Sequence, residues 1–150
     1  MDAASLLLNL HPEPLPGYKF QVFIQNVPMG FSRVTNIEQS VETEPLQEGG
    51  VNDRVYSLCR PQSMERTMVF ERGTAGRGLA PTVLARRFAV GQRLPEDILI
   101  LVMDRSGLPA RAYFVHGAVV RRCTWSDLDA MSGALLVERF EIAYETLECL

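Results

Sequence analysis

The sequence is poor in residues that form covalent or metal cross-links. Its 150 residues include three cysteines, an odd number, and no two of them have the Cys-x-x-Cys spacing of a zinc site. We therefore predict neither a disulfide framework nor a metal centre, and a reducing compartment is the simplest setting for the free thiols. The cysteines are Cys59, Cys123 and Cys149.

Positive charge is equally sparse. Apart from Lys19, all of the 15 basic residues are arginines, and no basic cluster is longer than Arg86-Arg87 or Arg121-Arg122. The formal net charge is −3. A nucleic-acid-binding face usually carries more, and more closely grouped, positive charge, so recognition of a specific nucleic-acid sequence is not expected.

Long hydrophobic runs are missing too. The apolar N-terminal stretch Leu6–Leu10 is interrupted by Asn9, has no basic flank and is followed by His11-Pro12. It fits neither a secretory signal nor a membrane-spanning helix. We therefore expect a chain that is cytoplasmic when it is made and that does not insert into a membrane directly.

Only two histidines are present, which limits the catalytic sites that the chain can build. His11 lies near the N-terminus, whereas His116 lies in an alternating stretch whose neighbours of like parity are mostly apolar. No Ser-His-Asp, Cys-His or two-His arrangement emerges from these residues. We predict that His116 is a packing residue and that the chain has no catalytic, cofactor-binding or metal-binding residues.

What is present is the composition of one ordinary globular domain. Hydrophobic residues make up 47% of the chain and charged residues 22%, and this length suffices to bury a core without cross-links. Prolines at positions 12, 14 and 16 predict an extended N-terminal arm over residues 1–17. Residues 18–150 form the predicted domain.

The stretch from Gly30 to Gly73 organises that domain. From Phe31 to Glu44 the residues of one parity are mainly apolar and those of the other polar, which predicts a long strand with one solvated face. Pro45 and Gly49-Gly50 should end the strand. The polar face carries Glu38, Ser40, Glu42 and Glu44, opposite Ile37 and Val41.

An excursion from Glu44 to Glu65 separates this strand from the next one, Arg66–Arg72. A segment of about twenty residues without structure of its own is usually functional or disordered in a compact domain. Its apolar residues are too few for a core but suffice to anchor a flap on another subunit. They are Leu46, Val51, Val55, Tyr56, Leu58 and Met64.

Other stretches predict further strands, two turns, a loop and one helix. The strands are Tyr18–Val27, Ile98–Met103, Ala110–Trp125 and Ala134–Leu147, the turns Pro28–Gly30 and Asp104–Gly107, and the loop residues 125–133. Apolar residues at helical spacing, with Pro81 at the start and Gly91 at the end, predict an amphipathic helix over Pro81–Val90.

Two details of these strands carry expectations about burial. Ile98–Met103 is apolar throughout, which predicts a strand covered on both faces. Glu138 interrupts the apolar face of the last strand, so we expect an arginine or backbone amides beside it. The whole pattern predicts a mainly β fold with one α-helix, an antiparallel sandwich or barrel with a long extended loop.

An ordered set of motifs along the chain resembles the tail-tube protein family of contractile phages and related contractile injection systems. The resemblance covers about residues 18–147, and no single motif in it is specific. The motifs are Phe20-x-Val22-x-Ile24, Gly30-Phe31, Val34, Ile37-Glu38, Glu44, Glu48-Gly49-Gly50, Asn52, Thr67, Arg72-Gly73, Leu136-Val137-Glu138 and Phe140–Glu145.

The resemblance implies a structural subunit that forms hexameric rings, which stack into the inner tube of a phage tail or injection particle. The partners implied are further copies of the chain and the sheath, baseplate, spike and cap proteins, in a virion tail or released particle. The excursion is then an inter-subunit loop, with candidate residues Glu44, Leu46, Glu48, Gly49, Gly50, Asn52, Val55 and Tyr56. The polar strand face, with Glu38, Ser40 and Glu42, is a candidate lumen lining.

Two other functions stay open at this level. The chain departs from the usual family pattern at Leu58–Pro61, where Leu-Pro-Gly is common, and at Tyr144, where His is usual. Relatives that start the tube at the baseplate vary in such places, so a tube initiator of the same fold is the first alternative. The second is a small β-barrel enzyme or ligand-binding protein that uses His116 with Asp104 or Glu138.

Overall fold

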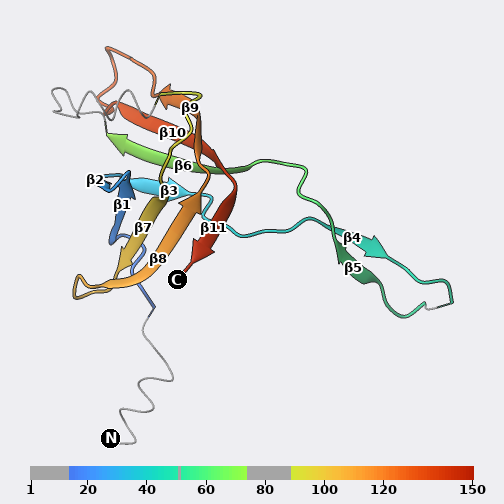
Figure 1. The fold of residues 1–150 in the computed structure, drawn as a ribbon. Helices are drawn as coiled ribbons and strands as arrows, with labels where there is room; N and C mark the ends of the chain where they lie inside the picture. Colours follow the sequence, from blue (N-terminus) through green and yellow to red (C-terminus); the bar gives the residue numbers. More distant parts are fainter. Residues whose placement is uncertain (1–13, 51, 74–88) are drawn as a thin grey trace, which may run out of the picture.

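The computed structural model describes residues 14–50, 52–73 and 89–150, and within these residues every regular element is a β-strand (Figure 1). A five-stranded antiparallel sheet has the order β11-β8-β7-β1-β2, and a four-stranded one has the order β3-β6-β10-β9. The five-stranded sheet comprises β1 (Phe20–Ile24), β2 (Val27–Met29), β7 (Ile98–Met103), β8 (Pro109–His116) and β11 (Thr146–Cys149). The four-stranded sheet comprises β3 (Arg33–Thr35), β6 (Arg66–Gly73), β9 (Val119–Trp125) and β10 (Val137–Tyr144).

The core lies between the inner faces of these two sheets. Alternation along each strand sends one set of apolar side chains inward, which is the period-two pattern of a half-buried strand. The residues with at most 1% exposure are Val22, Ile24, Ile98, Ile100 and Val115 from the first sheet and Met68, Phe70, Val120 and Ile142 from the second, with Ala118 between them. The strands Ile98–Met103 and Arg66–Gly73 agree closely with their predicted bounds.

Two predicted strands are each divided by a corner between the sheets. Gly117 and Ala118 separate β8 from β9, and Glu145 separates β10 from β11, so each chain segment leaves one sheet and enters the other. The amide of Glu145 donates to the carbonyl of His116 over 2.9 Å, which ties the two corners together. The predictions of single strands over Ala110–Trp125 and Ala134–Leu147 were therefore wrong, because the chain bends sharply at each corner and the buried positions change parity there.

The first hairpin turns earlier than predicted. Gln25 and Asn26 have φ values of 52° and 61°, so they form the two-residue turn between β1 and β2. Pro28 and Met29, predicted as the turn, lie in β2 instead. Proline is tolerated there because β2 is an edge strand of its sheet.

The long strand predicted from Phe31 to Glu44 is also wrong. Only Arg33–Thr35 pairs with β6, and Asn36, with φ of 65°, then turns the chain out of the sheet. The excursion is not structureless, since β4 (Thr43–Leu46) and β5 (Tyr56–Cys59) form an antiparallel hairpin. Pro45 lies within β4 opposite Ser57 rather than ending the strand, which a two-stranded sheet with free outer edges allows.

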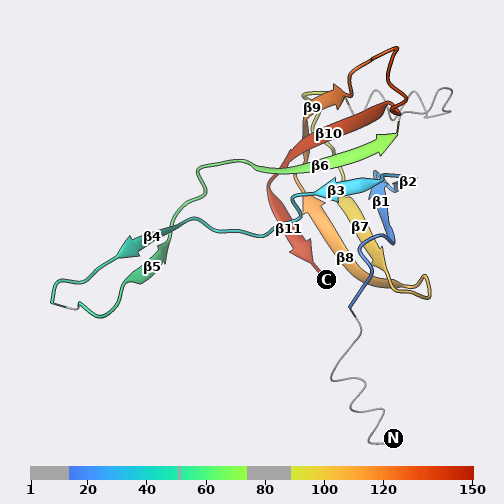
Figure 2. The same cartoon turned by 180° about the vertical axis from the view of Figure 1, so that it is seen from behind.

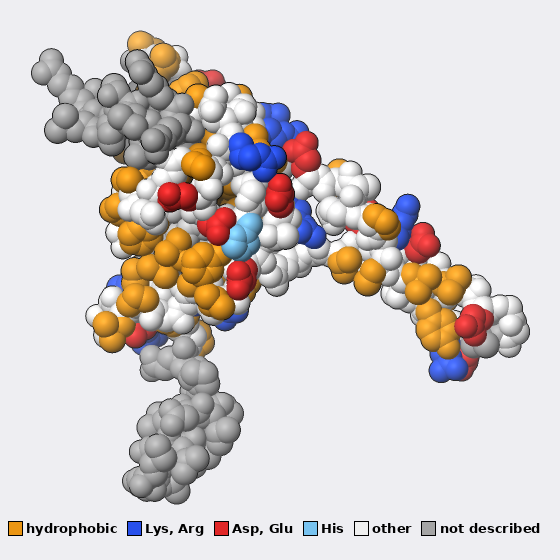
Figure 3. All heavy atoms as spheres, in the orientation of Figure 1, with side chains coloured by type: hydrophobic (Ala, Val, Ile, Leu, Met, Phe, Trp, Pro, Cys, Tyr) orange, Lys and Arg blue, Asp and Glu red, His pale blue; other side chains and the backbone are white. Residues whose placement is uncertain are grey.

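The predicted helix Pro81–Val90 lies outside the described residues except for Ala89 and Val90, which lead into a turn at Gly91. The described strands form separate sheets joined at corners rather than a closed barrel. Ile98–Met103 is covered by described elements on its inner face only. Leu99 and Leu101, on the other face, are half-exposed, and a hydrophobic patch lies on this side of the molecule beside the histidine (Figure 3).

Candidate functional site

The β4–β5 hairpin projects far from the sandwich (Figures 1 and 2). Its strands pair with each other, from Thr43 opposite Cys59 to Leu46 opposite Tyr56, and with no other described strand. The hairpin therefore adds nothing to the core of its own domain.

Apolar side chains on the hairpin are open to solvent. Figure 3 shows hydrophobic side chains at several places along its visible face. The exposed fractions are 44% for Leu46, 56% for Val55, 38% for Tyr56 and 44% for Leu58. Large apolar side chains gathered on a projecting element mark an interaction surface or an aggregation risk.

The base of the hairpin is cross-braced by hydrogen bonds. The amide of Arg60 donates to the carbonyl of Glu42 over 2.8 Å, and the hydroxyl of Ser63 donates to the Glu42 carboxylate, with Oγ–Oε1 at 2.8 Å. The hydrogen bonds from Ser63 lower the pKa of Glu42 below its ordinary value. The two chain segments that lead into the hairpin are thus held together.

Further hydrogen bonds attach these segments to the sandwich. Gln39 donates its side-chain amide to the carbonyl of Leu147 over 2.6 Å, and the Tyr144 hydroxyl donates to the carbonyl of Glu38 over 3.1 Å. Arg66 donates to the carbonyl of Ser40 over 3.1 Å. These bonds act where the hairpin leaves the body, so they set its direction.

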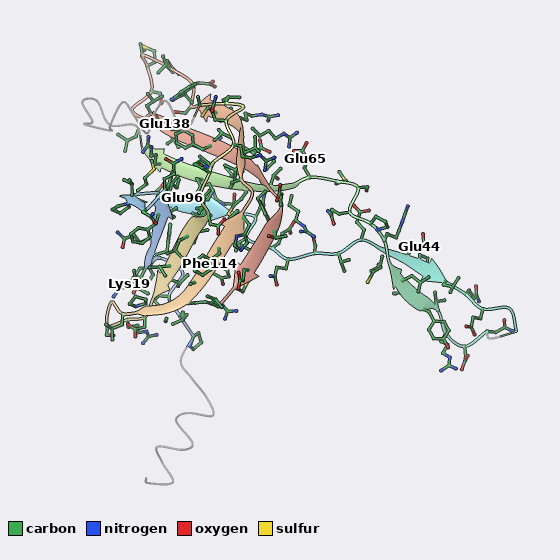
Figure 4. The ribbon with its side chains drawn as sticks, in the orientation of Figure 1. Lys19, Glu44, Glu65, Glu96, Phe114 and Glu138 are labelled. Carbon is green, nitrogen blue, oxygen red and sulfur yellow. The ribbon has the colours of Figure 1, made fainter. Side chains whose placement is uncertain are left out.

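The candidate inter-subunit residues are brought together on this hairpin. Glu44 and Leu46 lie on β4, Tyr56 lies on β5, and Glu44 forms an ion pair with Arg60 at 3.4 Å (Figure 4). Gly50 has a φ of 87°, as its place in the turn region requires. The remaining candidates, Glu48, Gly49, Asn52 and Val55, are exposed between the strands.

The candidate lumen residues lie on the segment that links β3 to β4. Glu38 and Ser40 are exposed, whereas Glu42 is half-buried against Ser63. Ile37 and Val41, of the opposite parity, are also exposed, by 37% and 58%. Within a single chain, the alternation of apolar and polar residues in this segment therefore does not separate a solvent-exposed face from a buried face.

His116 meets different carboxylates from those in the enzyme hypothesis. Its Nδ1 lies 2.7 Å from Asp97 Oδ2 and its Nε2 lies 3.2 Å from Glu148 Oε2. Asp97 and Glu148 were missed because they are remote in sequence, and only the β8–β11 pairing and the start of β7 bring them to the histidine.

The two carboxylates named in the enzyme hypothesis have structural partners elsewhere. Asp104 accepts hydrogen bonds from the amides of Ser106 and Leu108, both at 2.9 Å, within the β7–β8 turn. Glu138 lies 2.9 Å from Arg72 Nε, which confirms the expected arginine, and 3.2 Å from Trp125 Nε1. No group of His, Cys, Asp and Glu among the described residues could hold a metal ion.

A second surface, unforeseen from the sequence, is an open cavity of about 850 Å³ at one end of the core. It lies where the short β3 leaves the inner face of the five-stranded sheet uncovered. Its apolar lining includes Phe20, Val34, Val102 and Tyr113, and Arg33 and Arg111 lie in its wall. The sequence predicted neither the inward direction of Tyr113, whose parity is opposite to that of His116, nor the gap above it.

A comparison with models of protein families identifies the family of this chain. Residues 16–148 match the family model described as T4-like virus tail tube protein gp19. The chain belongs to this tail tube family. The family is structural and not enzymatic, and its members are components of phage tails and contractile injection systems. The comparison with curated protein sequences found no match.

Solved structures of other proteins share the fold of this chain. One is a chain of the anti-feeding prophage baseplate, with a TM-score of 0.74 and 24% identity over 93% of this chain and 97% of that chain. Two come from the extracellular contractile injection system PVC. The sheath-tube complex gives a TM-score of 0.75 at 17% identity, covering 100% and 98% of the two chains. The sheath/tube terminator gives 0.76 at 18% identity, covering 93% and 98%.

The family assignment accounts for what the site lacks as well as for what it has. Within the described residues, no helix is long and apolar enough to span a lipid bilayer. The exposed features are a braced apolar hairpin and an open cavity, both of which suit protein contacts rather than chemistry.

Proposed function

We propose that this chain is a ring-forming subunit of the inner tube of a phage tail or contractile injection particle. Six copies form a ring and rings stack into a tube. The observation that carries the proposal is the β4–β5 hairpin, whose exposed Leu46, Val55, Tyr56 and Leu58 contribute nothing to their own domain. In a ring these side chains lie on a neighbouring copy.

Assembly gives a physical reason for a costly element. Holding a projecting hairpin in one conformation costs roughly 1 to 2 kcal/mol per residue in backbone entropy, and the exposed apolar residues favour uncontrolled association. Burial against another copy offsets both costs, and closed symmetry repeats the same contact at every subunit boundary. A closed ring also leaves fewer free strand edges than a monomer does.

The polar segment between β3 and β4 is proposed to face the lumen of the tube. Glu38 and Ser40 are exposed in the single chain, and Glu42 adds a carboxylate whose pKa is lowered by Ser63. An acidic lining repels polyanions and reduces adhesion of cargo. Replacing Glu38 by glutamine tests this role, because its carboxylate takes no part in bracing the hairpin, so assembly should persist while anionic probes enter the tube more readily.

The proposed partners are further copies of the chain, a surrounding sheath, a baseplate and spike at one end and a cap at the other. The subunit is expected in the cytoplasm during assembly and afterwards in a virion tail or released particle. The unusual Leu58–Pro61 sequence at the hairpin base favours a tube initiator at the baseplate as the second candidate. An initiator forms one ring and requires the main tube protein for growth.

The decisive experiment removes the hairpin. Replacing Gln47–Met64 with a short Gly-Ser linker should leave a folded, soluble domain that forms no rings or tubes, as measured by sedimentation and electron microscopy. The unmodified chain, alone or with its baseplate partners, provides the reference. Normal tubes from the shortened chain would show that assembly resides elsewhere, in the strand edges or the N-terminal arm.

A matched pair of point variants separates the hairpin from general surface hydrophobicity. Leu58→Ser removes an exposed leucine from β5, whereas Leu128→Ser removes one that is 87% exposed on the β9–β10 loop. We expect the first to weaken assembly much more than the second, with equal melting temperatures. Equal loss of assembly in both variants would contradict the assignment of the hairpin as the inter-subunit element.

A further inference from the structure

The open cavity is an unfilled end of the hydrophobic core. Phe20, Val102 and Tyr113 have the same inward parity as the fully buried Val22 and Ile100. They are only half-buried, because β3 is three residues long and does not extend over this end of the five-stranded sheet. Apolar groups that point into an uncovered cavity favour an occupant that completes the core.

The wall of the cavity is positively charged. Arg33 and Arg111 line it, and none of the lining residues that the structure describes is acidic. Arg33 lies 3.8 Å from Glu71, and the Arg111 guanidinium lies 5.7 Å from the centre of the Tyr113 ring. The cavity therefore suits an occupant that combines apolar and acidic side chains.

The β4–β5 hairpin has this combination. Residues 43–60 carry the carboxylates Glu44, Glu48 and Asp53 and the arginines Arg54 and Arg60, together with the exposed apolar side chains described above. Arg60 pairs with Glu44 at the base, which leaves Glu48 and Asp53 against Arg54 at the tip. We propose that the cavity of one copy receives the hairpin of a second copy, with Arg33 and Arg111 facing its acidic tip. This inference rests on the proposed function and identifies the surface that the hairpin binds.

The hairpin of a chain does not reach the cavity of the same chain. The hairpin points away from the sandwich in both views, and hydrogen bonds from Gln39, Arg66 and Tyr144 fix its base (Figures 1 and 2). The cavity lies at the end of the sandwich where β1, β3, β7 and β8 meet. Docking therefore joins two copies, which is the geometry that assembly needs.

Charge distinguishes the cavity from the other apolar surface of the molecule. The outer face of the five-stranded sheet carries Phe23, Leu99 and Phe114 side by side in register. Figure 4 labels Phe114 on β8. Glu148 lies opposite Phe114 in the β8–β11 ladder, and the Asp97 carboxylate contacts His116. Two carboxylates therefore border this apolar face. An acidic hairpin is repelled there and attracted to the arginines of the cavity.

Charge reversal tests the proposal. Arg33→Glu with Arg111→Glu should reduce hairpin-dependent association on the order of tenfold or more, and adding Glu48→Arg with Asp53→Arg should restore it. Arg122→Glu, on β9 outside the cavity, is the control and should leave association unchanged. Loss without restoration, or an equal loss in the control, would overturn the proposal.

Disulfide trapping gives an independent readout. In a Cys59→Ser background, one batch carries Tyr56→Cys on the hairpin and another carries Ala110→Cys in the cavity wall. Oxidation of the mixture should give a cross-linked dimer containing one chain of each batch. Gln21→Cys, on the outer face of the same sheet, should give at most a tenth of that yield when it replaces Ala110→Cys. A higher yield of cross-linked dimer from position 21 than from position 110 would place the hairpin on the outer face of the sheet and overturn the proposal.

The remaining occupant to test is the N-terminal segment of residues 1–13, because Pro14 and Leu15 lie in the cavity wall. To test this occupant, the first batch carries Leu7→Cys in place of Tyr56→Cys. Cross-linking of position 110 to position 7 in place of position 56 would overturn the proposal.

If hairpin deletion blocks tubes while the arginine reversals do not, the proposed function stands and the receptor surface is wrong. If hairpin deletion leaves tubes intact, the role of the hairpin itself fails.

Discussion

Arg72 and Glu138 face each other across the β6–β10 ladder, with Arg72 Nε 2.9 Å from Glu138 Oε2. Both side chains are largely buried, and the guanidinium also lies 5.2 Å from the centre of the Phe140 ring. Trp125 donates its indole N–H to the other oxygen of Glu138. A carboxylate that interrupts an apolar strand face is thus satisfied from both neighbouring strands.

Glu138→Gln should destabilise the domain by about 1 to 3 kcal/mol, because it leaves the arginine without a counter-charge in a largely buried position. Glu44→Gln removes the partner of Arg60 in an exposed pair and should change stability by less than about 0.5 kcal/mol. Chemical denaturation of both variants measures the difference. Equal effects would mean that burial of the Arg72–Glu138 pair has no energetic consequence.

Gly117→Ala should destabilise the corner between β8 and β9. Gly117 has a φ of 66°, and a Cβ there would overlap the side chain of Glu145. We expect a loss of about 1 to 2 kcal/mol, since both backbone strain and a steric clash oppose the alanine.

Gly107→Ala is the matched control for that variant, because Gly107 also has a positive φ but has open space around it. It should cost less than Gly117→Ala, and adding Glu145→Ala to Gly117→Ala should recover part of the loss. Thermal melts of the three variants provide the measurement. No recovery in the double variant would assign the whole cost to the backbone.

The β7–β8 turn should weaken in acid through Asp104. Hydrogen bonds from Ser106 and Leu108 lower the pKa of Asp104 below its ordinary value of 3.8. A carboxyl group whose pKa is lower in the folded state stabilises the fold above its unfolded pKa, and this contribution is lost as the pH falls through the folded pKa. Asp104→Asn should therefore lower the melting temperature at neutral pH, and the difference from the unmodified chain should shrink in acid. A difference that is constant with pH would exclude this coupling.

Cysteine labelling should separate the hairpin from the body. Cys59 is exposed on β5, whereas burial, followed by the charge of Glu138, raises the pKa of Cys123. Because the thiolate is the reactive form, a maleimide should modify Cys59 on the order of tenfold faster than Cys123 in the free subunit. In assembled particles Cys59 should become protected. Persistent fast labelling of Cys59 in intact tubes would place the hairpin base outside every subunit interface.

Short-range chemistry in the sequence determined much of the fold. An uninterrupted apolar run predicted β7 closely. Alternation predicted β6 and identified the inward residues of β1 and β10, because the period of two depends only on which side chains are apolar. The Asp104–Gly107 turn followed from its own residues, and Gly107 has the expected positive φ of 88°. The need of Glu138 for an arginine followed from the cost of burying a charge.

Tertiary structure decided where the strands bend, what they pair with and what stays uncovered. At both corners the inward positions change parity, from Val115 to Ala118 across Gly117 and from Tyr144 to Leu147 across Glu145, so treating each stretch as one alternating strand missed the change of sheet. The alternation of apolar and polar residues continues past Asn36 in the sequence. The positive φ of Asn36 nevertheless turns the residues that follow it out of the β-ladder. The partners of His116 and the end of the core that β3 leaves open depend on contacts between residues far apart in the chain. Such contacts form only when both sheets are in place, which is why the hairpin was foreseeable as an excursion and the cavity was not foreseeable at all.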